Sequence, residues 1–347
     1  MPEAPLPDPL ERLIEDAFEP AAESLAAGRI PGAALGIVAS DGRRAVRWGG
    51  LARREPAPKP LERNTVFDLA SLTKVMFTTP EIFRLVEEGR IDLDDPIGRH
   101  LPDLHQYDPG HPIRRFTIRQ LLAHQTGLVA VEPIYTWGRD PETLKALILQ
   151  RDWPIGEPVY SDINFILLGL LAERLRGRPL AAFDLPAGLS FRPEAERCAA
   201  TEDCPWRGRV LEGDVHDENA YALGGGAGHA GLFGTIDAVL DFARAFMAGE
   251  VLTPASLAAL RAGRAGTRVL GWEAKHPGWA GGSLCSDETI GHTGFTGTGL
   301  WLDFGRGVAW ALLTNRVHPT RHAETGIMGL RRAVGNRIAA GWSALSG

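Results

Sequence analysis

One apolar stretch in the first quarter of the chain carries a lysine where a buried side chain is expected. Residues 67–79 read FDLASLTKVMFTT, and apolar residues lie on several sides of the helix that this stretch predicts. A lysine inside a buried helix needs a partner, because an unpaired charge is costly to remove from water. Any fold of this chain must therefore bring polar groups to Lys74. Ser71, three residues earlier, lies on the same helix face.

Ser71 and Lys74 form the pattern S-x-x-K, which suits nucleophilic chemistry. A serine hydroxyl is a weak nucleophile at neutral pH, and a nearby amine can take its proton. The same residues also fit a helix cap followed by a surface lysine, because so short a pattern arises by chance in many chains of 347 residues. The rest of the sequence has to decide between the two interpretations.

The composition is that of an ordinary globular protein, with 44% hydrophobic and 23% charged residues. The net charge of −6 offers no basic surface of the kind that binds nucleic acid or anionic membranes. No run of eighteen apolar residues predicts a membrane span. We therefore expect a protein that acts on a small-molecule substrate, without nucleic acid or a membrane span. The sequence leaves the oligomeric state open, with a monomer as the first expectation.

Cysteine, histidine and the N-terminus bear on redox state, metals and compartment. Cys198, Cys204 and Cys285 are odd in number and form no close pair, so we expect free thiols. The ten histidines show no metal-ligand spacing, and we assign no metal and no cofactor. The N-terminus is acidic and proline-rich and lacks the basic-then-apolar pattern of an export signal. The expectation is a cytoplasmic protein, or a periplasmic or extracellular one if a signal has been removed.

Both ends of the chain predict strands as well as helices. The turn Asp41-Gly42 between two apolar runs is a strong hairpin signal. Glycines separate short β-rich runs after residue 224. The predicted strands are 33–39, 45–48, 268–272, 289–293, 299–303 and 308–314, and the predicted helices are 9–27, 71–88, 235–247, a short one from 253, and 319–344.

The middle of the chain has a different texture. Prolines recur between residues 91 and 218, and helical patterns lie over 117–124, 141–149 and 163–175 with little strand between them. We therefore expect an α/β (α+β) fold, in which 1–90 and 219–347 build one antiparallel sheet covered by helices, and 91–218 form an inserted all-helical domain. Active sites favour the seam between two such domains.

Two further clusters carry chemistry. Tyr160-Ser161-Asp162 precedes the apolar helix, and a phenol beside a lysine can have its pKa lowered and act as a base. A tyrosine that fastens a loop to the core fits this cluster as well. The second cluster, residues 291–299, is a strand rich in Gly and Thr along which a substrate could take main-chain hydrogen bonds. A glycine-rich hairpin is the simpler alternative.

Together the three clusters resemble the motif set of serine β-lactamases and penicillin-binding proteins. The set is Ser71-x-x-Lys74, Tyr160-x-Asp162 and His292-Thr293-Gly294, in that order. It looks like the branch that contains class C β-lactamases, D-alanyl-D-alanine carboxypeptidases, D-aminopeptidases and related esterases. Residues 121–128 (LLAHQTGL) and 228–233 (GHAGLF) match two further family segments. The resemblance covers nearly the whole chain and implies a β-lactamase/transpeptidase-like fold.

The resemblance also implies roles for individual residues. Ser71 would be the nucleophile of a serine hydrolase that forms an acyl-enzyme with a β-lactam, a D-amino-acid peptide or a small ester. Lys74 would share in activating Ser71, and Tyr160 would be the general base that returns the proton to the leaving group. The backbone N–H groups of Ser71 and Phe295 would form the oxyanion hole. The substrate-binding residues implied are Asp162, His292, Thr293, Gly294 and Phe295.

Two positions depart from the family pattern. His292 stands where many members have lysine, which is similar to the D,D-peptidase-like members and would make carboxylate binding depend on pH. Asp162 stands where the family has asparagine. An ionised carboxylate only accepts hydrogen bonds, so Asp162 cannot donate to a substrate carbonyl and should instead hold Lys74 protonated. We therefore expect Tyr160 to be the base, and an ester or small amide to be the substrate.

Several rival interpretations remain to be weighed. The G-x-G-x-x-G pattern at 226–231 lies in no βαβ unit, which argues against nucleotide binding. The chain has no G-x-S-x-G of an α/β-hydrolase and no deacylating glutamate of a class A β-lactamase. His216-Asp217-Glu218, with His229, suggests a metal site or an acid pair, but such a group more often stabilises a loop. A binding protein of the same fold with weak or lost turnover stays an alternative because of Asp162.

Overall fold

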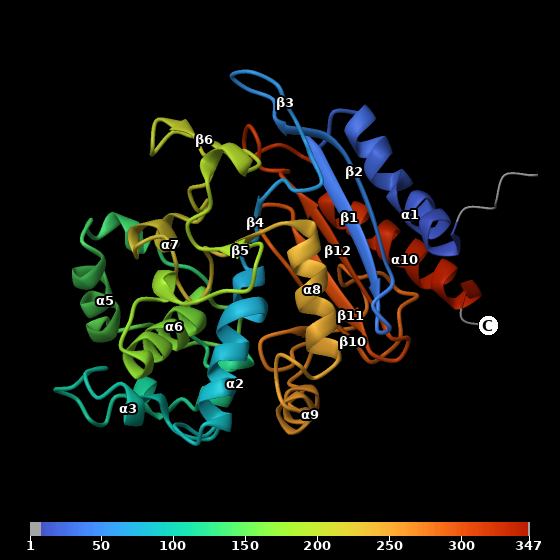
Figure 1. Ribbon diagram of the computed structural model, residues 1–347. Helices are drawn as coiled ribbons and strands as arrows, with labels where there is room; N and C mark the ends of the chain where they lie inside the picture. The colour runs from blue at the N-terminus through green and yellow to red at the C-terminus, as the bar shows by residue number, and fades with distance from the viewer. Residues whose placement is uncertain (1–7, 346–347) are drawn as a thin grey trace, which may run out of the picture.

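Helices cover both faces of one antiparallel sheet, and a helix-rich region lies beside it (Figure 1). The computed structural model describes residues 8–345. The first seven residues, on which the prediction of the compartment partly rests, lie outside the described residues. The seven strands of the sheet follow the order β3-β2-β1-β12-β11-β10-β9. Their bounds are β1 Gly32–Ala39, β2 Arg44–Arg53, β3 Lys59–Pro60, β9 Glu273–Ala274, β10 Thr289–Thr293, β11 Gly299–Asp303 and β12 Val308–Thr314.

The two ends of the chain meet in the centre of this sheet. β1 pairs with β12 in antiparallel register, with Ile37 opposite Trp310. All residues of β1 and β12 are buried, which explains why both read as continuous apolar runs without alternation. The antiparallel sheet with flanking helices that the sequence predicts is therefore confirmed.

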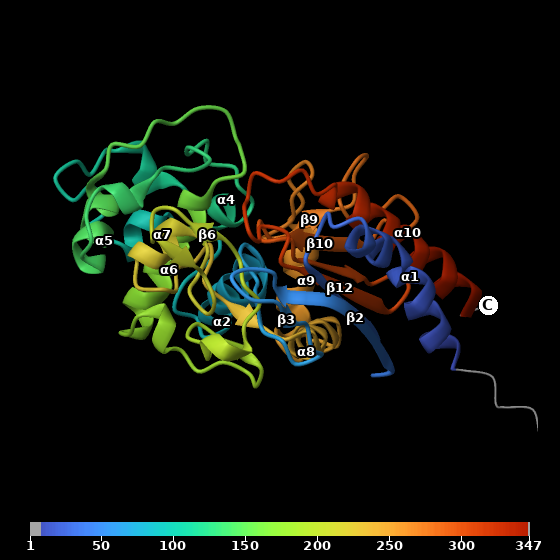
Figure 2. The same cartoon turned by 90° about the horizontal axis from the view of Figure 1, so that it is seen from above.

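Three helices bury the two faces of the sheet. α1 (Pro9–Ala26) and α10 (Ile327–Leu345) pack side by side on one face, and α8 (Ile236–Met247) covers the other, as Figures 1 and 2 show. α1 begins where the Asp8 side chain accepts a hydrogen bond from the N–H of Leu10 (2.8 Å), and Pro9 occupies the first turn, where no N–H is needed.

The helix-rich region is organised around α6 (Asp162–Arg176). Every residue of α6 from 163 to 172 is buried, as expected for a helix that is apolar all round. Three two-residue strands also lie between residues 188 and 211. The division into two domains at residues 90 and 218 stays a prediction. The other elements of this region are α3 Ile97–His100, α4 Ile118–Leu122, α5 Pro141–Gln150, β5 Leu189–Ser190, β6 Asp203–Cys204 and β7 Arg209–Val210.

The predicted helix over 71–88 is not one regular helix. Residues Lys74–Thr78 form a wide π-helical turn, η1, and α2 (Thr79–Glu87) follows. Pro80 lies in the first turn of α2, where its missing N–H removes the bond that would continue a regular helix. All residues of η1, Lys74 included, are buried.

Two other predicted elements were wrong in extent. Residues 268–272 form a tight turn instead of a strand, because Gly271 has φ +83° and the N–H of Trp272 bonds back to Val269 (3.0 Å). The C-terminal helix begins at Ile327 instead of residue 319. Arg321 in the preceding loop is held by Glu202 and Glu218 in ion pairs of 2.5 Å, and Gly326 has φ +66°.

Asp68, at the end of β4 (Phe67–Asp68), fastens the turn that precedes Ser71. Its two carboxylate oxygens accept the N–H of Ala70 (2.8 Å) and the N–H of His216 (2.6 Å). Ala70 has φ +47°, a strained conformation for a residue with a side chain, so the turn depends on the two hydrogen bonds that Asp68 accepts. The β10–β11 turn docks on the same segment, because Thr296 Oγ1 donates to the carbonyl of Asp68 (2.7 Å).

We expect Asp68→Asn to lower the free energy of unfolding by about 1–3 kcal/mol. The amide keeps the volume but places an NH2 group against one of the two N–H donors, which leaves that donor unsatisfied in the interior. Urea unfolding followed by circular dichroism measures the change. Asp94→Asn is the matched control, since it breaks an exposed pair with Arg119 and should change stability by less than about 0.5 kcal/mol. Equal stability of Asp68→Asn and wild type would contradict this account of the turn.

Candidate active site

Lys74 lies at the centre of the predicted site and is fully buried. Its ammonium nitrogen contacts Ser71 Oγ at 2.9 Å, Asp162 Oδ1 at 2.8 Å and the carbonyl oxygen of His229 at 3.1 Å. The contacts with Ser71 and His229 are hydrogen bonds that the ammonium donates, and the contact with Asp162 is an ion pair. They come from η1 and the turn before it, the first turn of α6, and the 226–231 segment, which the fold brings together behind the serine.

The charge state of Lys74 follows from these neighbours. Burial on its own lowers the pKa of Lys74, but the charge of the Asp162 carboxylate and the interaction with Tyr160 outweigh it, and the pKa is raised. Lys74 is therefore an ammonium ion at neutral pH. Asp162 keeps 19% of its side chain exposed, so it pairs with the buried amine while it still faces the cleft. The ion pair is the one that the sequence predicts.

Tyr160 lies in front of Lys74, with its ring centroid 5.0 Å from the ammonium nitrogen. Burial raises the pKa of the Tyr160 phenol, and the charge of Asp162 adds to this. The Lys74 charge and hydrogen bonds to Lys74 and Ser71 act in the opposite direction and do not outweigh the rise. Lys74 lowers the pKa of this phenol, as the sequence predicts, but burial outweighs the lysine and the resting phenol is protonated.

His292, Thr293 and Gly294 lie along and just after β10, facing the same cleft. His292 is buried, its Nδ1 lies 2.9 Å from the carbonyl oxygen of Thr293, and its Nε2 has no hydrogen-bond partner among residues 8–345. Burial, together with the charges of Lys74 and Arg268, lowers the pKa of His292 well below its ordinary value. The expectation that His292 titrates near neutrality is therefore wrong, and the ring is neutral at physiological pH.

The two amides predicted for an oxyanion hole are free to donate. Neither the N–H of Ser71 nor that of Phe295 donates a hydrogen bond to any residue of the described chain, 8–345. The neighbouring N–H of Gly294, in contrast, is taken by Thr298 O at 2.9 Å. The Phe295 side chain is 51% exposed at the edge of the cleft. Unpaired N–H groups beside a nucleophile are the arrangement that stabilises an oxyanion.

A cleft of about 830 Å³ joins these residues. Of the predicted site residues, all except Lys74 line it, and Lys74 lies directly behind Ser71. Four arginines share the lining, at positions 268, 316, 321 and 331. Arg331 is buried and donates to the carbonyls of Gly294 (2.9 Å) and Thr298 (2.7 Å), so it fixes the β10–β11 turn. Its burial lowers the pKa of the guanidinium to about 9.

Two histidines in the site have contacts that sequence patterns did not reveal. The His124 ring lies 4.5 Å from that of Tyr160, and its Nδ1 accepts the N–H of Ser161 (3.0 Å), which orients the tyrosine loop. Burial lowers the pKa of His124 well below its ordinary value, so it acts as a neutral acceptor. His229 uses its backbone carbonyl on Lys74. The matching segments 121–128 and 228–233 pointed to these regions but not to these contacts.

The acidic and histidine residues near residue 216 stabilise loops. His216 Nε2 lies 3.2 Å from Glu202 Oε2, and His229 Nε2 lies 2.9 Å from Asp217 Oδ1. Each histidine thus has its own carboxylate partner, and among residues 8–345 no three side chains of metal-ligand type converge. The three cysteines are buried free thiols, as predicted. No helix of the described chain has the length and apolar character needed to cross a membrane.

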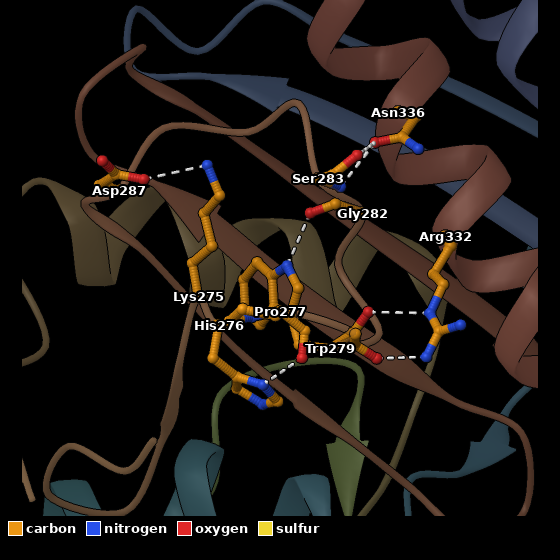
Figure 3. Close-up of a pocket in the computed structure, with 10 residues that line it drawn as sticks. Lys275, His276, Pro277, Trp279, Gly282, Ser283, Asp287, Arg332 and Asn336 are labelled. Carbon is orange, nitrogen blue, oxygen red and sulfur yellow. Dashed lines mark hydrogen bonds and ion pairs between the residues drawn. The ribbon is translucent and has the colours of Figure 1, made fainter. Parts of the chain in front are cut away.

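A second pocket, of about 400 Å³, lies between the 275–287 loop and α10 (Figure 3). Its polar groups are satisfied by each other. Lys275 pairs with Asp287 at 3.0 Å, Arg332 donates to the carbonyl of Trp279 at 3.1 Å, and the Trp279 indole donates to Gly282 O at 2.6 Å. None of the residues of the three motifs lines this pocket, and we assign it no function.

Comparison with known proteins agrees with this geometry. A family model described as Beta-lactamase matches residues 12–334. An N-acetylmuramyl-L-alanine amidase of Bacillus subtilis is 30% identical over 350 residues, which cover 85% of this chain and 79% of that protein. A solved class C β-lactamase is similar with a TM-score of 0.74 at 17% identity, covering 96% of this chain and 99% of that one. A solved penicillin-binding protein homologue from Caulobacter crescentus is similar with a TM-score of 0.71 at 21% identity, covering 96% of this chain and 98% of that one.

The two solved structures share the fold that the motif set implied for this chain, although their identity is low. The family model extends over far more than half of the chain and includes all three motif clusters. The chain therefore belongs to the Beta-lactamase family.

Proposed function

We propose that the protein is a serine hydrolase that cleaves an ester or an amide through an acyl-enzyme on Ser71. The observation that carries the proposal is the 2.9 Å contact between Ser71 Oγ and the ammonium of Lys74, at the base of a cleft with two unpaired N–H donors. Membership of a family of β-lactamase-fold hydrolases supports it. A nucleophile, a charged group and oxyanion donors in one cleft are the parts that acyl transfer requires.

Tyr160 is the base in this proposal, and Lys74 supplies electrostatic support. The phenolate of Tyr160 takes the proton of Ser71 as Oγ attacks the substrate carbonyl carbon, and the N–H groups of Ser71 and Phe295 stabilise the oxyanion. Tyr160 then gives that proton to the leaving group, and water releases the acyl group by the same steps. Because the pKa of Tyr160 is raised, its phenolate is a minor species at neutral pH, and turnover rises as the phenol ionises.

The substrate class has two candidates. Asp162 has no N–H to donate to an acyl-side carbonyl, which favours an ester. The Bacillus subtilis relative, by its name, is an amidase of N-acetylmuramyl-L-alanine, which favours an amide. Both candidates use the same nucleophile and cleft. A second candidate function is a binding protein with weak turnover, because both Lys74 and Tyr160 are protonated in the resting site. Acylation of Ser71 would argue against this candidate, and its absence would favour it.

Acylation of Ser71 is the first expected outcome. Wild-type protein treated with a fluorophosphonate should gain the mass of one phosphonyl group, measured on the intact protein, and peptide mapping should place it on Ser71. Ser71→Ala should stay unlabelled and lose at least about 10³-fold in kcat, because the nucleophile acts as part of a unit. An unlabelled wild type, or equal labelling of Ser71→Ala, would contradict the proposal.

Asp162→Asn should move the acidic limb of the pH–kcat/KM profile to lower pH. The Asp162 charge raises the pKa of both Lys74 and Tyr160, so its removal lowers both. A base works only when unprotonated, and a lower pKa makes it available at lower pH. The side-chain amide also gains a donor, so turnover of a D-amino-acid anilide should rise relative to p-nitrophenyl butyrate.

Asp152→Asn is the control for this substitution, because that carboxylate is exposed and pairs with His111. It should leave the pH profile and the ratio of anilide to ester turnover as in wild type. If the acidic limb of the pH–kcat/KM profile moves to higher pH in Asp162→Asn, the argument that the Asp162 charge raises the pKa of Lys74 and Tyr160 is wrong. An unchanged ratio would overturn the argument that Asp162 selects against amides.

A further inference from the structure

Three aromatic side chains from separate segments gather beside the cleft. Tyr135 lies in η3 (Ile134–Thr136), Trp206 in the turn between β6 and β7, and Tyr221 in α7 (Glu218–Ala222). The ring centroids of Tyr135 and Trp206 are 4.8 Å apart, and those of Trp206 and Tyr221 are 5.9 Å apart, both edge to face. We call these three side chains the aromatic platform.

The platform is open to solvent. Trp206 is 49% exposed and Tyr221 is 39% exposed, although edge-to-face packing buries part of each ring. Aromatic side chains that only fasten a hairpin to its neighbours gain most when they are fully buried. A cluster of aromatic side chains that stays exposed to solvent is instead typical of a ligand-binding or interaction surface.

Arg207 holds the platform against the wall of the cleft. Its guanidinium lies 4.1 Å from the ring centroid of Tyr221, and it donates to the carbonyls of Val215 (2.7 Å) and His216 (3.3 Å). His216 and the next two residues line the cleft. The guanidinium Nε is buried and has no hydrogen-bond partner among residues 8–345. Arg207 thus fixes Tyr221 and leaves one donor unused.

Short links connect the platform to the reacting groups. Asp217 caps α7, the helix that carries Tyr221, and Asp217 also contacts His229 at 2.9 Å. The carbonyl of His229 in turn accepts a hydrogen bond from the ammonium of Lys74. On the other side, the N–H of Tyr135 donates to Asn219 of α7 (3.1 Å). Tyr221 therefore belongs to the helix whose first residue, Glu218, lines the cleft, and Tyr135 is bonded to the same helix.

We propose that the aromatic platform binds a pyranose ring of the substrate at the mouth of the cleft; this inference rests on the proposed function of Ser71. The apolar C–H face of a pyranose matches an exposed aromatic ring, and its hydroxyl groups need charged or polar neighbours at the rim. Arg207, over the Tyr221 ring, and Glu218, in the lining of the cleft, supply such groups. A lipid chain would need a continuous apolar wall in their place. The N-acetylmuramyl group in the name of the Bacillus subtilis relative is a sugar of this kind.

Kinetics with two substrates test the inference. N-acetylmuramyl-L-alanine carries a pyranose and p-nitrophenyl butyrate does not. In Trp206→Ala and Tyr221→Ala, the ratio of kcat/KM for the sugar substrate to that for the small ester should fall at least tenfold, mainly through KM. Trp206→Phe, which keeps an aromatic face, should restore most of the ratio. Tyr107→Ala, at an exposed tyrosine outside the platform, should leave the ratio unchanged.

A binding measurement separates this inference from the proposed function. N-acetylmuramic acid should bind Ser71→Ala, which has no nucleophile, and binding should weaken at least tenfold when Trp206→Ala is added. Labelling of Ser71 without sugar binding would overturn the platform and leave the hydrolase intact. Sugar binding that depends on Trp206 in a protein whose Ser71 cannot be labelled would support the platform and overturn the hydrolase. Equal losses on both substrates in Trp206→Ala would also overturn the platform.

Discussion

The ion pair between Lys74 and Asp162 is the interaction on which the site depends. Removing an ammonium ion from water costs several kcal/mol, and the cost is met only if every donor finds a partner of good geometry. Lys74 donates hydrogen bonds to Ser71 Oγ and the carbonyl of His229 and forms an ion pair with Asp162, and these partners come from three separate segments. The charged amine therefore fixes where these segments lie relative to each other. It also donates a hydrogen bond to Ser71 Oγ, so in this charge state Lys74 cannot take the serine proton.

Close packing behind the lysine makes this arrangement possible. The 226–231 segment approaches α6 so closely that a Cβ on Gly228 would lie 2.0 Å from the carbonyl oxygen of Phe165. Only glycine allows this approach, which brings the carbonyl of His229 to Lys74. The glycines at 226–231 thus serve helix packing instead of a phosphate site. The hydroxyl of Thr78 donates to Gly228 O (2.6 Å) and fastens the same segment to η1.

Local patterns in the sequence predicted much of the fold and named residues that the structure brings together at one cleft. Apolar runs and the Asp41-Gly42 turn indicated a sheet built from both ends of the chain, and the pairing of β1 with β12 realises it. The charge pairing of Asp162 with Lys74 followed from the carboxylate itself. The π-helical turn was not predictable in the same way, because a change of pitch near Pro80 leaves the apolar pattern intact.

The pKa directions and the aromatic platform depend on residues far apart in the chain. The sequence predicted a lowered pKa for Tyr160 and a pKa near neutrality for His292. The structure gives a raised pKa for Tyr160 and a strongly lowered one for His292, because both side chains are buried by segments that no sequence spacing links. Tyr135, Trp206 and Tyr221 are separated by many residues and share no motif. Such sets appear only when the tertiary structure brings them together.

The charge on Lys74 can be measured directly. In protein labelled with ¹³C-lysine, the Cε resonance of Lys74, assigned by its loss in Lys74→Arg, should be followed through a pH titration. We predict that the midpoint of this titration lies above pH 10.5, the ordinary pKa of lysine, because Asp162 holds the ammonium form. A midpoint below about pH 8 would show a neutral amine at working pH, as burial without an effective partner produces. That result would contradict the account and return the role of base to Lys74.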